Sequence, residues 1–448
     1  MSTRNSWLLP FALAASICLL TVSSLADSQA RIVRLSLVDG EVQIDRNAGQ
    51  GFEQAFLNLP ITQGAKLRTG PGARAEVEFE DGSTLRMTPG TVVEFPGLAL
   101  HDSGARASSV NLQQGTAYLN FKGRKGEEFA LGFGSEKLAL TRPAHLRVEL
   151  KDTTATLAVF KGDVDVEGPS GRVEVEKKRS AIFDLAEGRS TLANNLEPDP
   201  YDDWDKQQDQ YQQRYSLASN SFSPYGYGTS DLNYYGSFYN LPGYGLMWQP
   251  YLVGAGWDPF MNGAWMWYPG SGYTWVSAYP WGWMPYRYGS WVFVPSGGWF
   301  WQPGSTWAGW NTGPHIVNAP PSFAVAKPPA RPGQSLVVNR IALPMPARAP
   351  QDHVQNRLEI RGDSASLGIP RGSVRNLGRV AQQFDRTAGL AGGTTRVPLG
   401  GSAHRSGDSR VVAPGGGFSP HASSTVGATS RMSAPAHSSH GSNGSSHK

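Results

Sequence analysis

Apolar and polar residues alternate in short runs through residues 31–185. In the run 76–80 acidic residues alternate with apolar ones, Asp81 and Gly82 then suit a turn, and the alternation resumes at 84–87. Because successive residues of a strand point to opposite faces, this pattern predicts a β-hairpin with one buried face. No comparable 3.6-residue period occurs in this part of the chain, so we expect strands and turns rather than helices.

A glycine followed by alternating β-branched residues recurs at 40–44, 162–166 and 171–175. Each glycine suits a turn, and each following run suits a strand. Strands repeated at roughly 8–12 residue intervals are typical of a sandwich, a barrel or a β-solenoid. We therefore predict a mainly β protein whose N-terminal domain, residues 27–190, is a β-sandwich or is β-solenoid-like.

Four blocks in this domain resemble the FecR domain family: residues 38–42, 64–75, 79–86 and 159–164, in that order. The resemblance implies an extracytoplasmic all-β domain used for recognition or for signal relay across an envelope. FecR-type regulators carry a cytoplasmic anti-sigma segment before their membrane anchor. Here only a handful of residues precede the apolar run that begins at Trp7. We therefore do not expect direct control of a sigma factor.

The first 26 residues have the pattern of a signal peptide. Arg4 precedes an apolar run from Trp7 to Val22, and the run Ser24-Leu25-Ala26, with small residues at its first and last positions, suits cleavage after Ala26. An uncleaved N-terminal anchor is the alternative. We expect a protein exported to the periplasm or cell envelope, with no transmembrane span in its mature chain. Cys18, the single cysteine, lies inside the run, so disulfides and Cys-ligated metals are excluded.

A short connecting helix is predicted in residues 198–217, with Asp199 as its N-cap and Pro200 at its first position. Aspartates follow in the first turns, where the helix dipole favours acids. They could instead form a cation site, but they lack the glycine and terminal glutamate of a calcium loop. Aromatic residues share one face of the helix: Tyr201, Trp204, Tyr211 and Tyr215.

Residues 222–315 form a module rich in tryptophan, tyrosine and glycine. Twelve of the fourteen tryptophans lie between Trp248 and Trp310, and turn-like prolines divide the segment. We predict short hairpins stacked through their aromatic rings. The run 280–293 resembles an aromatic repeat module of unknown function that is often fused behind FecR-like domains; this resemblance implies an architecture and no activity.

The tryptophans allow two interpretations. They could be the core of a module with few aliphatic residues, which we favour, or an exposed surface on which sugar rings stack. Twelve in so short a segment are too many to bury completely, so we expect some to be exposed. Our candidate stacking residues are three pairs with a two-residue spacing, which would share a face on a strand: Trp265, Trp267, Trp281, Trp283, Trp299 and Trp301.

Residues 316–448 are rich in Pro, Gly, Ser, Arg and His, and we predict that they are a disordered tail. A short element or docking segment between Arg361 and Phe384 is the one exception. The tail carries 15 Lys and Arg against 5 Asp and Glu. It could bind an anionic surface, such as lipid headgroups or wall polymer, or could be a solvating linker. We expect no nucleic-acid partner for an exported chain.

Signatures of catalysis and metal binding are weak. The Gly-Asp-Ser tripeptides at 362–364 and 407–409 lie in the predicted tail, and the chain has neither a phosphate-binding loop nor an HExxH motif. Five of the nine histidines are irregularly spaced near the C-terminus, where incidental composition explains them better than a metal site. We predict no cofactor, no metal and no enzymatic activity.

These patterns favour a non-catalytic binding or scaffolding protein of the envelope, which recognises a protein or a cell-wall glycan. The alternative is a signal-relay component of a FecR-like regulatory system, acting with a separate membrane partner. A cell-wall hydrolase ranks last, because no acid–base pair stands out.

Overall fold

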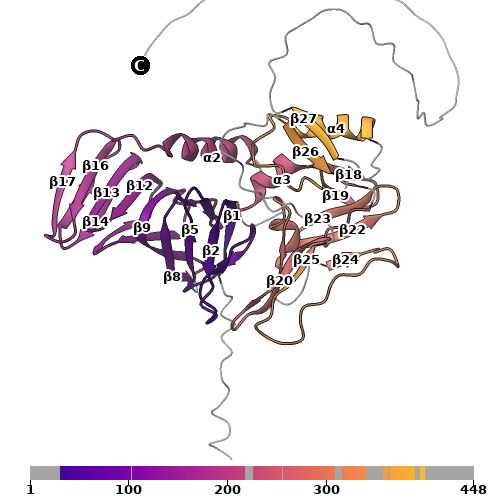
Figure 1. The fold of residues 1–448 in the computed structure, drawn as a ribbon, viewed down its shortest axis with the longest axis horizontal. Coiled ribbons are helices and arrows are strands. Elements are labelled where there is room, and N and C mark those ends of the chain that lie inside the picture. The colour runs from indigo at the N-terminus through magenta and orange to yellow at the C-terminus, as the bar shows by residue number, and fades with distance from the viewer. Residues whose placement is uncertain are drawn as a thin grey trace, which may run out of the picture. The chain divides into compact units, whose positions relative to one another are not determined.

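The computed structural model describes residues 31–101, 103–216, 226–254, 256–307, 315–339, 357–361, 364–388 and 394–398. The predicted signal peptide and the end of the predicted tail lie outside these residues. The described protein is mainly β, as predicted (Figure 1). None of its described helices has the length and apolar character needed to cross a membrane.

Two layers of strands, here called sheets A and B, form the N-terminal domain (Figure 1). Sheet A contains β1 (Val33–Asp39), β4 (Pro60–Ile61), β6 (Arg74–Glu78), β7 (Thr84–Met87), β12 (Ala144–Lys151), β13 (Thr154–Lys161), β16 (Arg179–Asp184) and β17 (Arg189–Ala193). Sheet B contains β2 (Val42–Asp45), β3 (Glu53–Gln54), β5 (Lys66–Thr69), β8 (Val92–Leu100), β10 (Glu127–Phe133), β11 (Glu136–Leu140), β14 (Val164–Gly168) and β15 (Gly171–Val175).

The two sheets share one long strand, β9 (Arg106–Phe121). Its first half pairs with β8 and β10 of sheet B, and its second half pairs with β7 and β12 of sheet A. The change occurs at Gly115, which has a φ of 86°. A Cβ atom there would lie 2.6 Å from the Cα of Thr91. Glycine alone meets both conditions, so the corner between the sheets depends on this residue.

Alternate residues of both sheets point into one apolar core. The predicted glycine–valine runs are confirmed as strands β2, β14 and β15, and their valines lie in this core. The last three hairpins of the domain alternate between the two sheets. β12–β13 and β16–β17 extend sheet A, and β14–β15, which lies between them in the sequence, extends sheet B.

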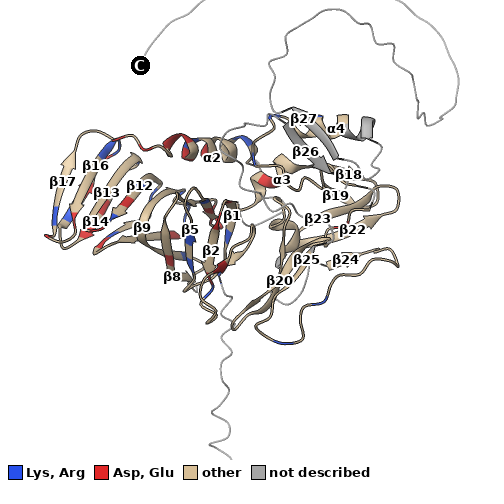
Figure 2. Cartoon of the chain, in the orientation of Figure 1, with Lys and Arg blue, Asp and Glu red and all other residues tan. Residues whose placement is uncertain are grey.

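Helix α2 (Asp202–Tyr215) follows sheet A, in the segment where the sequence predicts a connecting helix. It begins two residues later than predicted, so the expected N-cap at Asp199 is wrong. The Asp199 carboxylate instead accepts a hydrogen bond from the N–H of Tyr201 at 2.8 Å, in the turn before the helix. Figure 2 shows acidic residues concentrated on α2, while the aromatic module has few charges.

Three hairpins form the aromatic module, as predicted. β18 (Gly236–Leu241) pairs with β19 (Gly245–Pro250), β20 (Asn262–Tyr268) pairs with β21 (Gly272–Ser277), and β22 (Tyr288–Val294) pairs with β23 (Gly298–Trp307). The module also contains α3 (Thr229–Tyr235), the 3-10 turn η1 (Met284–Tyr286) and β24 (His315–Val317).

One tryptophan pair does not lie on a strand. Trp281 and Trp283 occupy the turn before η1. The shared strand face that the two-residue spacing would give on a strand therefore does not arise for this pair. Pro280 and Pro285 on either side of it cannot donate to a ladder of hydrogen bonds.

The hairpin β20–β21 has two apolar faces that close two different cores. Ala264, Met266 and Tyr268 pack into the core of the N-terminal domain. Trp265 and Tyr273 lie on the opposite face and pack into the aromatic cluster of the module. Because successive strand residues point to opposite faces, a single hairpin belongs to both cores. The two parts therefore share a packed boundary.

Polar contacts cross the same boundary. The Asn58 amide donates hydrogen bonds to the carbonyls of Ser277 and Tyr279 at 3.0 and 2.8 Å. The Tyr268 hydroxyl donates to the carbonyl of Pro60 at 2.7 Å. These bonds satisfy polar groups that packing removes from water.

Parts of the predicted disordered tail are folded. Residues 315–339 include β25 (Leu336–Asn339), which pairs with β20. Residues 364–388, here called the C-terminal segment, include α4 (Leu377–Ala388), and this agrees with the docking segment predicted in that region. Two further described strands of the predicted tail, β26 (Arg357–Arg361) and β27 (Thr394–Pro398), pair with each other.

We predict that Gly115→Ala lowers the melting temperature markedly more than Gly104→Ala. Both glycines have positive φ, at 86° and 79°, so both alanines are strained to a similar degree. Only the Cβ at residue 115 meets backbone, whereas the Cβ at residue 104 enters open space. Differential scanning calorimetry of the two variants measures this difference, and equal shifts would mean that the corner tolerates a side chain.

Candidate functional site: a buried charge junction

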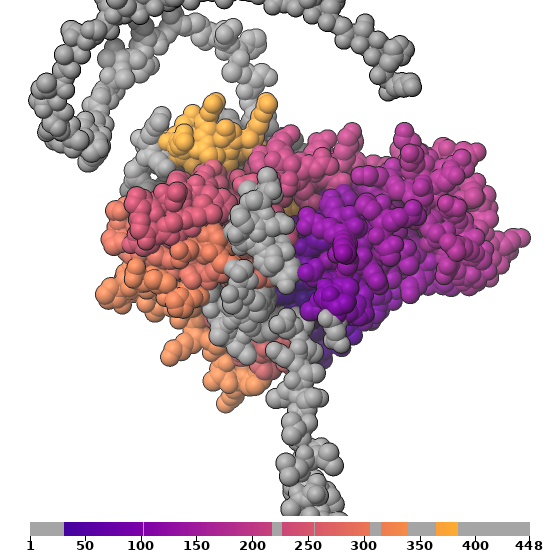
Figure 3. Space-filling view, turned by 180° about the vertical axis from the view of Figure 1, so that it is seen from behind, coloured from indigo at the N-terminus to yellow at the C-terminus, as the bar shows by residue number. Residues whose placement is uncertain are grey.

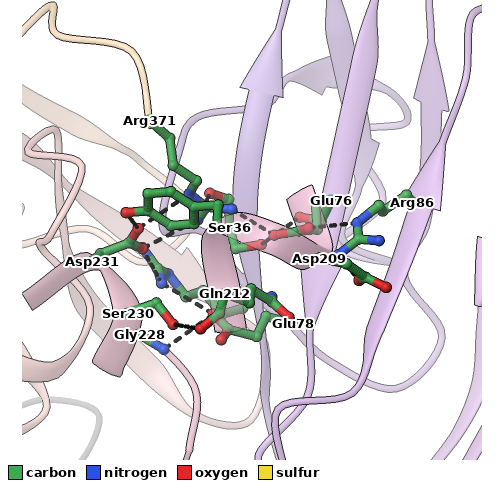
Figure 4. A network of polar contacts seen from close by, with 12 residues as sticks. Ser36, Glu76, Glu78, Arg86, Asp209, Gln212, Gly228, Ser230, Asp231 and Arg371 are labelled. Atoms are coloured by element: carbon green, nitrogen blue, oxygen red, sulfur yellow. Dashed lines mark hydrogen bonds and ion pairs between the residues drawn. The ribbon is translucent and has the colours of Figure 1, made fainter. Parts of the chain in front are cut away.

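The charged face of hairpin β6–β7 is buried, although its alternation predicts a hairpin with only one buried face. Glu76, Glu78 and Arg86 are each 5% exposed or less. Side chains from α2, α3 and the C-terminal segment cover this face (Figure 4). Figure 3 shows the C-terminal segment, in yellow, against the pink part of the chain that contains α2 and α3. The charge junction comprises Arg34, Glu76, Glu78, Arg86, Asp205, Asp209, Asp231 and Arg371.

Arg34, on β1, connects the N-terminal domain to the aromatic module. Its Nη1 lies 2.7 Å from Asp231 on α3 and 3.1 Å from Glu78 on β6. Its Nη2 donates to the carbonyl of Pro280 at 2.9 Å, and its Nε donates to Asn58 at 3.0 Å. The side chain is fully buried, so these partners replace all of its hydration.

Arg86, on β7, holds helix α2 against sheet A. Its Nε lies 2.8 Å from Glu76, its Nη1 lies 2.6 Å from Asp205, and its Nη2 lies 2.8 Å from Asp209. Asp205 and Asp209 are one helical turn apart, so one guanidinium reaches both. Asp205 is one of the first-turn aspartates that the sequence predicted, and its ion pair with Arg86 gives it a second role in docking the helix. Asp209, which the sequence analysis did not single out, has the same docking role.

Arg371, from the C-terminal segment, enters the junction between β6 and α3 (Figure 4). Its Nη1 lies 2.7 Å from Glu76, and its Nε lies 3.1 Å from Asp231. Its Nη2 donates to the Ser36 carbonyl at 2.8 Å, and its guanidinium lies 5.0 Å from the centre of the Tyr211 ring. One side chain thus contacts strand, helix and aromatic ring from four separate parts of the chain.

The two glutamates of β6 have opposite shifts in pKa. Burial raises the pKa of Glu76, but the charges of Arg371 and Arg86 outweigh burial and lower it to about 2. Burial raises the pKa of Glu78 to about 7, because Arg34 compensates it only in part and Asp231 adds a like charge. Glu76 is therefore a permanent anion at neutral pH, whereas Glu78 titrates near neutrality.

His145, Asp205 and Asp209 form a group whose side-chain atoms lie within 4.8 Å of one another, a spacing that a metal ion would allow. His145 Nε2 lies 2.8 Å from Asp205. The Arg86 guanidinium, however, already lies against both carboxylates and supplies their positive charge. These donors therefore fit an ion-paired cluster better than a metal site.

Five of the six candidate stacking tryptophans are buried. The exposed fractions of Trp265, Trp281, Trp283, Trp299 and Trp301 are 4%, 0%, 0%, 3% and 0%. Trp267 is half-buried and packs 5.1 Å from the ring of Tyr273. The stacking prediction is wrong for the five buried residues, because no ring face is open to a sugar. The favoured alternative, an aromatic core, is confirmed for them.

Burial of so many indoles is possible because other parts of the chain cover them. The indole N–H of Trp281 donates to the carbonyl of Ala365 at 3.0 Å, in the C-terminal segment. The ring of Trp299 lies 4.6 Å from that of Phe323, in residues 315–339. We expected some tryptophans to stay exposed because the hairpins of the module are too small to cover all of them. The C-terminal segment and residues 315–339 supply the additional cover.

The N-terminal domain and the module each match a family. Residues 65–165 match the FecR protein family. This part of the chain is FecR-like. Residues 229–321 match DUF6600, a family of unknown function. The FecR-like match contains Glu76, Glu78 and Arg86, and the second match contains Asp231. Arg34 and Arg371 lie outside both matches, so the junction is completed by residues that neither family covers.

Among solved structures, two crystal structures of a proposed anti-sigma factor from Parabacteroides distasonis ATCC 8503 are similar to the chain. They are 20% and 18% identical, and both TM-scores are 0.26. The similarity covers 29% and 34% of this chain and 59% and 65% of the solved chains. At these values the two structures carry no conclusion about this protein. Among curated proteins, none matches the chain.

We predict that Arg371→Ala lowers the free energy of unfolding by about 3–5 kcal/mol, because it leaves Glu76 and Asp231 buried with one cation fewer. Adding Glu76→Gln should cost less than the sum of the two single changes, since the paired charge is already gone. Urea unfolding of the two single variants and the double variant measures this coupling. Arg379→Ala, at an exposed position of α4, is the matched control and should change stability by about 0.5 kcal/mol or less. An Arg371→Ala protein as stable as the wild type would contradict the claim that the ion pairs of Arg371 stabilise the fold.

We predict that Glu78→Gln changes the pH dependence of stability. The pKa of Glu78 is about 7 in the folded protein against an ordinary value of 4.5, so its stabilising contribution is present below pH 4.5 and is lost as pH rises to 7. The melting temperature of the variant relative to the wild type should therefore rise between pH 5 and pH 8. Thermal melts across this range test it, and a constant difference would mean that Glu78 does not titrate there.

Proposed function

We propose that this protein is an exported, non-catalytic signal-relay component of a FecR-like regulatory system. The observation that carries this proposal is the FecR family match of residues 65–165. The signal-peptide pattern of residues 1–26 supports an envelope location. The alternative that we ranked second from the sequence is therefore now the better-supported one.

The charge junction supports a relay, since a relay needs an element whose state two sites can both bias. Arg34 and Arg371 each join the FecR-like domain to α3 of the module. A contact that shifts α3 or the C-terminal segment would break buried ion pairs, which is an abrupt change and not a graded one. The module would thus receive a contact, and the FecR-like domain would respond to it.

The proposed partner is a separate membrane protein of the envelope, which carries the signal onward. Binding to a cell-wall glycan is less well supported than before, because five of the six tryptophans that suggested it are buried. Catalysis also lacks support in the described residues, where the titratable groups that the fold brings together are ion-paired with one another.

The test is a deletion of the gene in the bacterium that encodes the protein, followed by transcript profiling. We expect a defined set of transcripts to change and the full chain to restore them. A version lacking residues 1–26 should fail to restore them, although it is made in normal amounts. Arg379→Ala, at an exposed site, should restore them as well as the wild type does.

Co-sedimentation with insoluble peptidoglycan separates the relay from direct wall binding. The relay predicts that the purified protein stays in the supernatant. Unchanged transcripts after deletion, together with pelleting of the purified protein, would contradict the proposal and return the glycan-binding interpretation.

A further inference from the structure

A proline-rich stretch crosses the aromatic module as a strap, residues 319–339. It contains five prolines and has no regular secondary structure before β25, which ends it. The stretch from Lys327 to Val337 is largely exposed, with Val337 at 62%. The strap is therefore held at a few points and is not packed along its length.

The end of the strap is held by the pairing of β25 with β20. Aromatic side chains supply the contacts before it. Phe323 of the strap lies 4.6 Å from Trp299 and 6.3 Å from Phe260, measured between ring centres. The indole N–H of Trp265 donates to the carbonyl of Ala326 at 2.6 Å. The hydroxyl of Tyr273 donates to the carbonyl of a residue farther along the strap, Arg331.

The groove that holds the strap thus consists of Phe260, Trp265, Tyr273 and Trp299, none of them more than 8% exposed. Trp265 and Tyr273 donate hydrogen bonds to backbone carbonyls, which are present at every residue whatever its side chain. A polyproline II segment has no internal hydrogen bonds and presents its carbonyls outward. Aromatic grooves with indole and hydroxyl donors recognise such segments with little loss of chain entropy. In the strap, a turn closed by the Phe323 N–H and the Pro320 carbonyl precedes residues 323–329, which have no regular secondary structure. The groove therefore holds a proline-flanked stretch through two backbone carbonyls and one aromatic ring.

We propose that this groove is a recognition site for extended proline-rich segments of a partner protein, and that the strap is its intramolecular occupant. A partner segment of the same chemistry replaces the strap. The inference goes beyond the relay and does not depend on it, because it rests on the groove alone.

An intramolecular occupant explains how such a site is kept closed. A tethered segment competes at an effective concentration in the mM range, so a free peptide binds the wild-type groove weakly. Loosening the strap while leaving the groove intact should therefore open the site. Phe323→Ala does this, because it removes the ring that packs on Trp299 and changes no groove residue.

The probe is a fluorescein-labelled peptide with the sequence of residues 319–339, titrated with full-length protein by fluorescence anisotropy. We expect the Phe323→Ala protein to bind it at least tenfold more tightly than the wild type. Adding Trp265→Phe, which keeps a ring and removes the N–H donor, should weaken binding about fivefold. A peptide with its five prolines replaced by serine should not bind. Equal binding of both peptides, or no binding to Phe323→Ala with an unchanged near-UV spectrum, would overturn the proposal.

A covalent lock keeps the test decisive if Phe323→Ala fails to fold. Ala264 of β20 and Val337 of the strap are register partners, so cysteines at both positions can form a disulfide in a Cys18→Ser background. The oxidised protein should not bind the proline-rich peptide, and reduction should restore the weak binding of the wild type. Equal binding by the oxidised and reduced forms would show that the strap does not occupy a peptide site.

Discussion

The guanidinium of Arg371 between Glu76 and Asp231 is the interaction on which the arrangement of this protein depends. Glu76 belongs to a strand of the FecR-like domain, Asp231 to a helix of the aromatic module, and Arg371 to neither. Burying a carboxylate without a cation costs free energy, and Arg371, from another part of the chain, supplies a cation to both of these acids. The charges therefore favour one arrangement of the three parts over alternatives that leave a charge unpaired.

Aromatic packing follows the same logic. The module contains more indole surface than its own hairpins can cover, and the C-terminal segment and the strap complete the enclosure. On the opposite face of β20–β21, the FecR-like domain covers Met266 and Tyr268. The two regions that match separate families are thus joined through their cores and their charges. This is why rings that looked suited to sugar binding are unavailable.

The sequence predicted local structure well and long-range contacts poorly. Alternation identified the hairpin β6–β7, and aromatic spacing identified α2, since both depend on neighbouring residues. The acids of β6 gave no local sign of burial, because Arg371 lies 295 residues from Glu76. The sequence placed Asp205 in the first turn of α2 but gave no sign that Asp205 and Asp209 both pair with Arg86, which lies more than 100 residues away along the chain. The apolar residues between Arg361 and Phe384 were the one signal in the sequence for a docking segment at this distance along the chain.

The central claim is that the FecR-like domain and the aromatic module form one cooperative body joined by buried ion pairs. A single urea titration, followed by tryptophan fluorescence and by far-UV circular dichroism, tests it directly. Twelve of the fourteen tryptophans report on residues 248–310, whereas most strands that contribute to the dichroism belong to the FecR-like domain. The account predicts that the two transitions coincide in midpoint and slope. Two separate transitions would show that the regions fold independently and would contradict it.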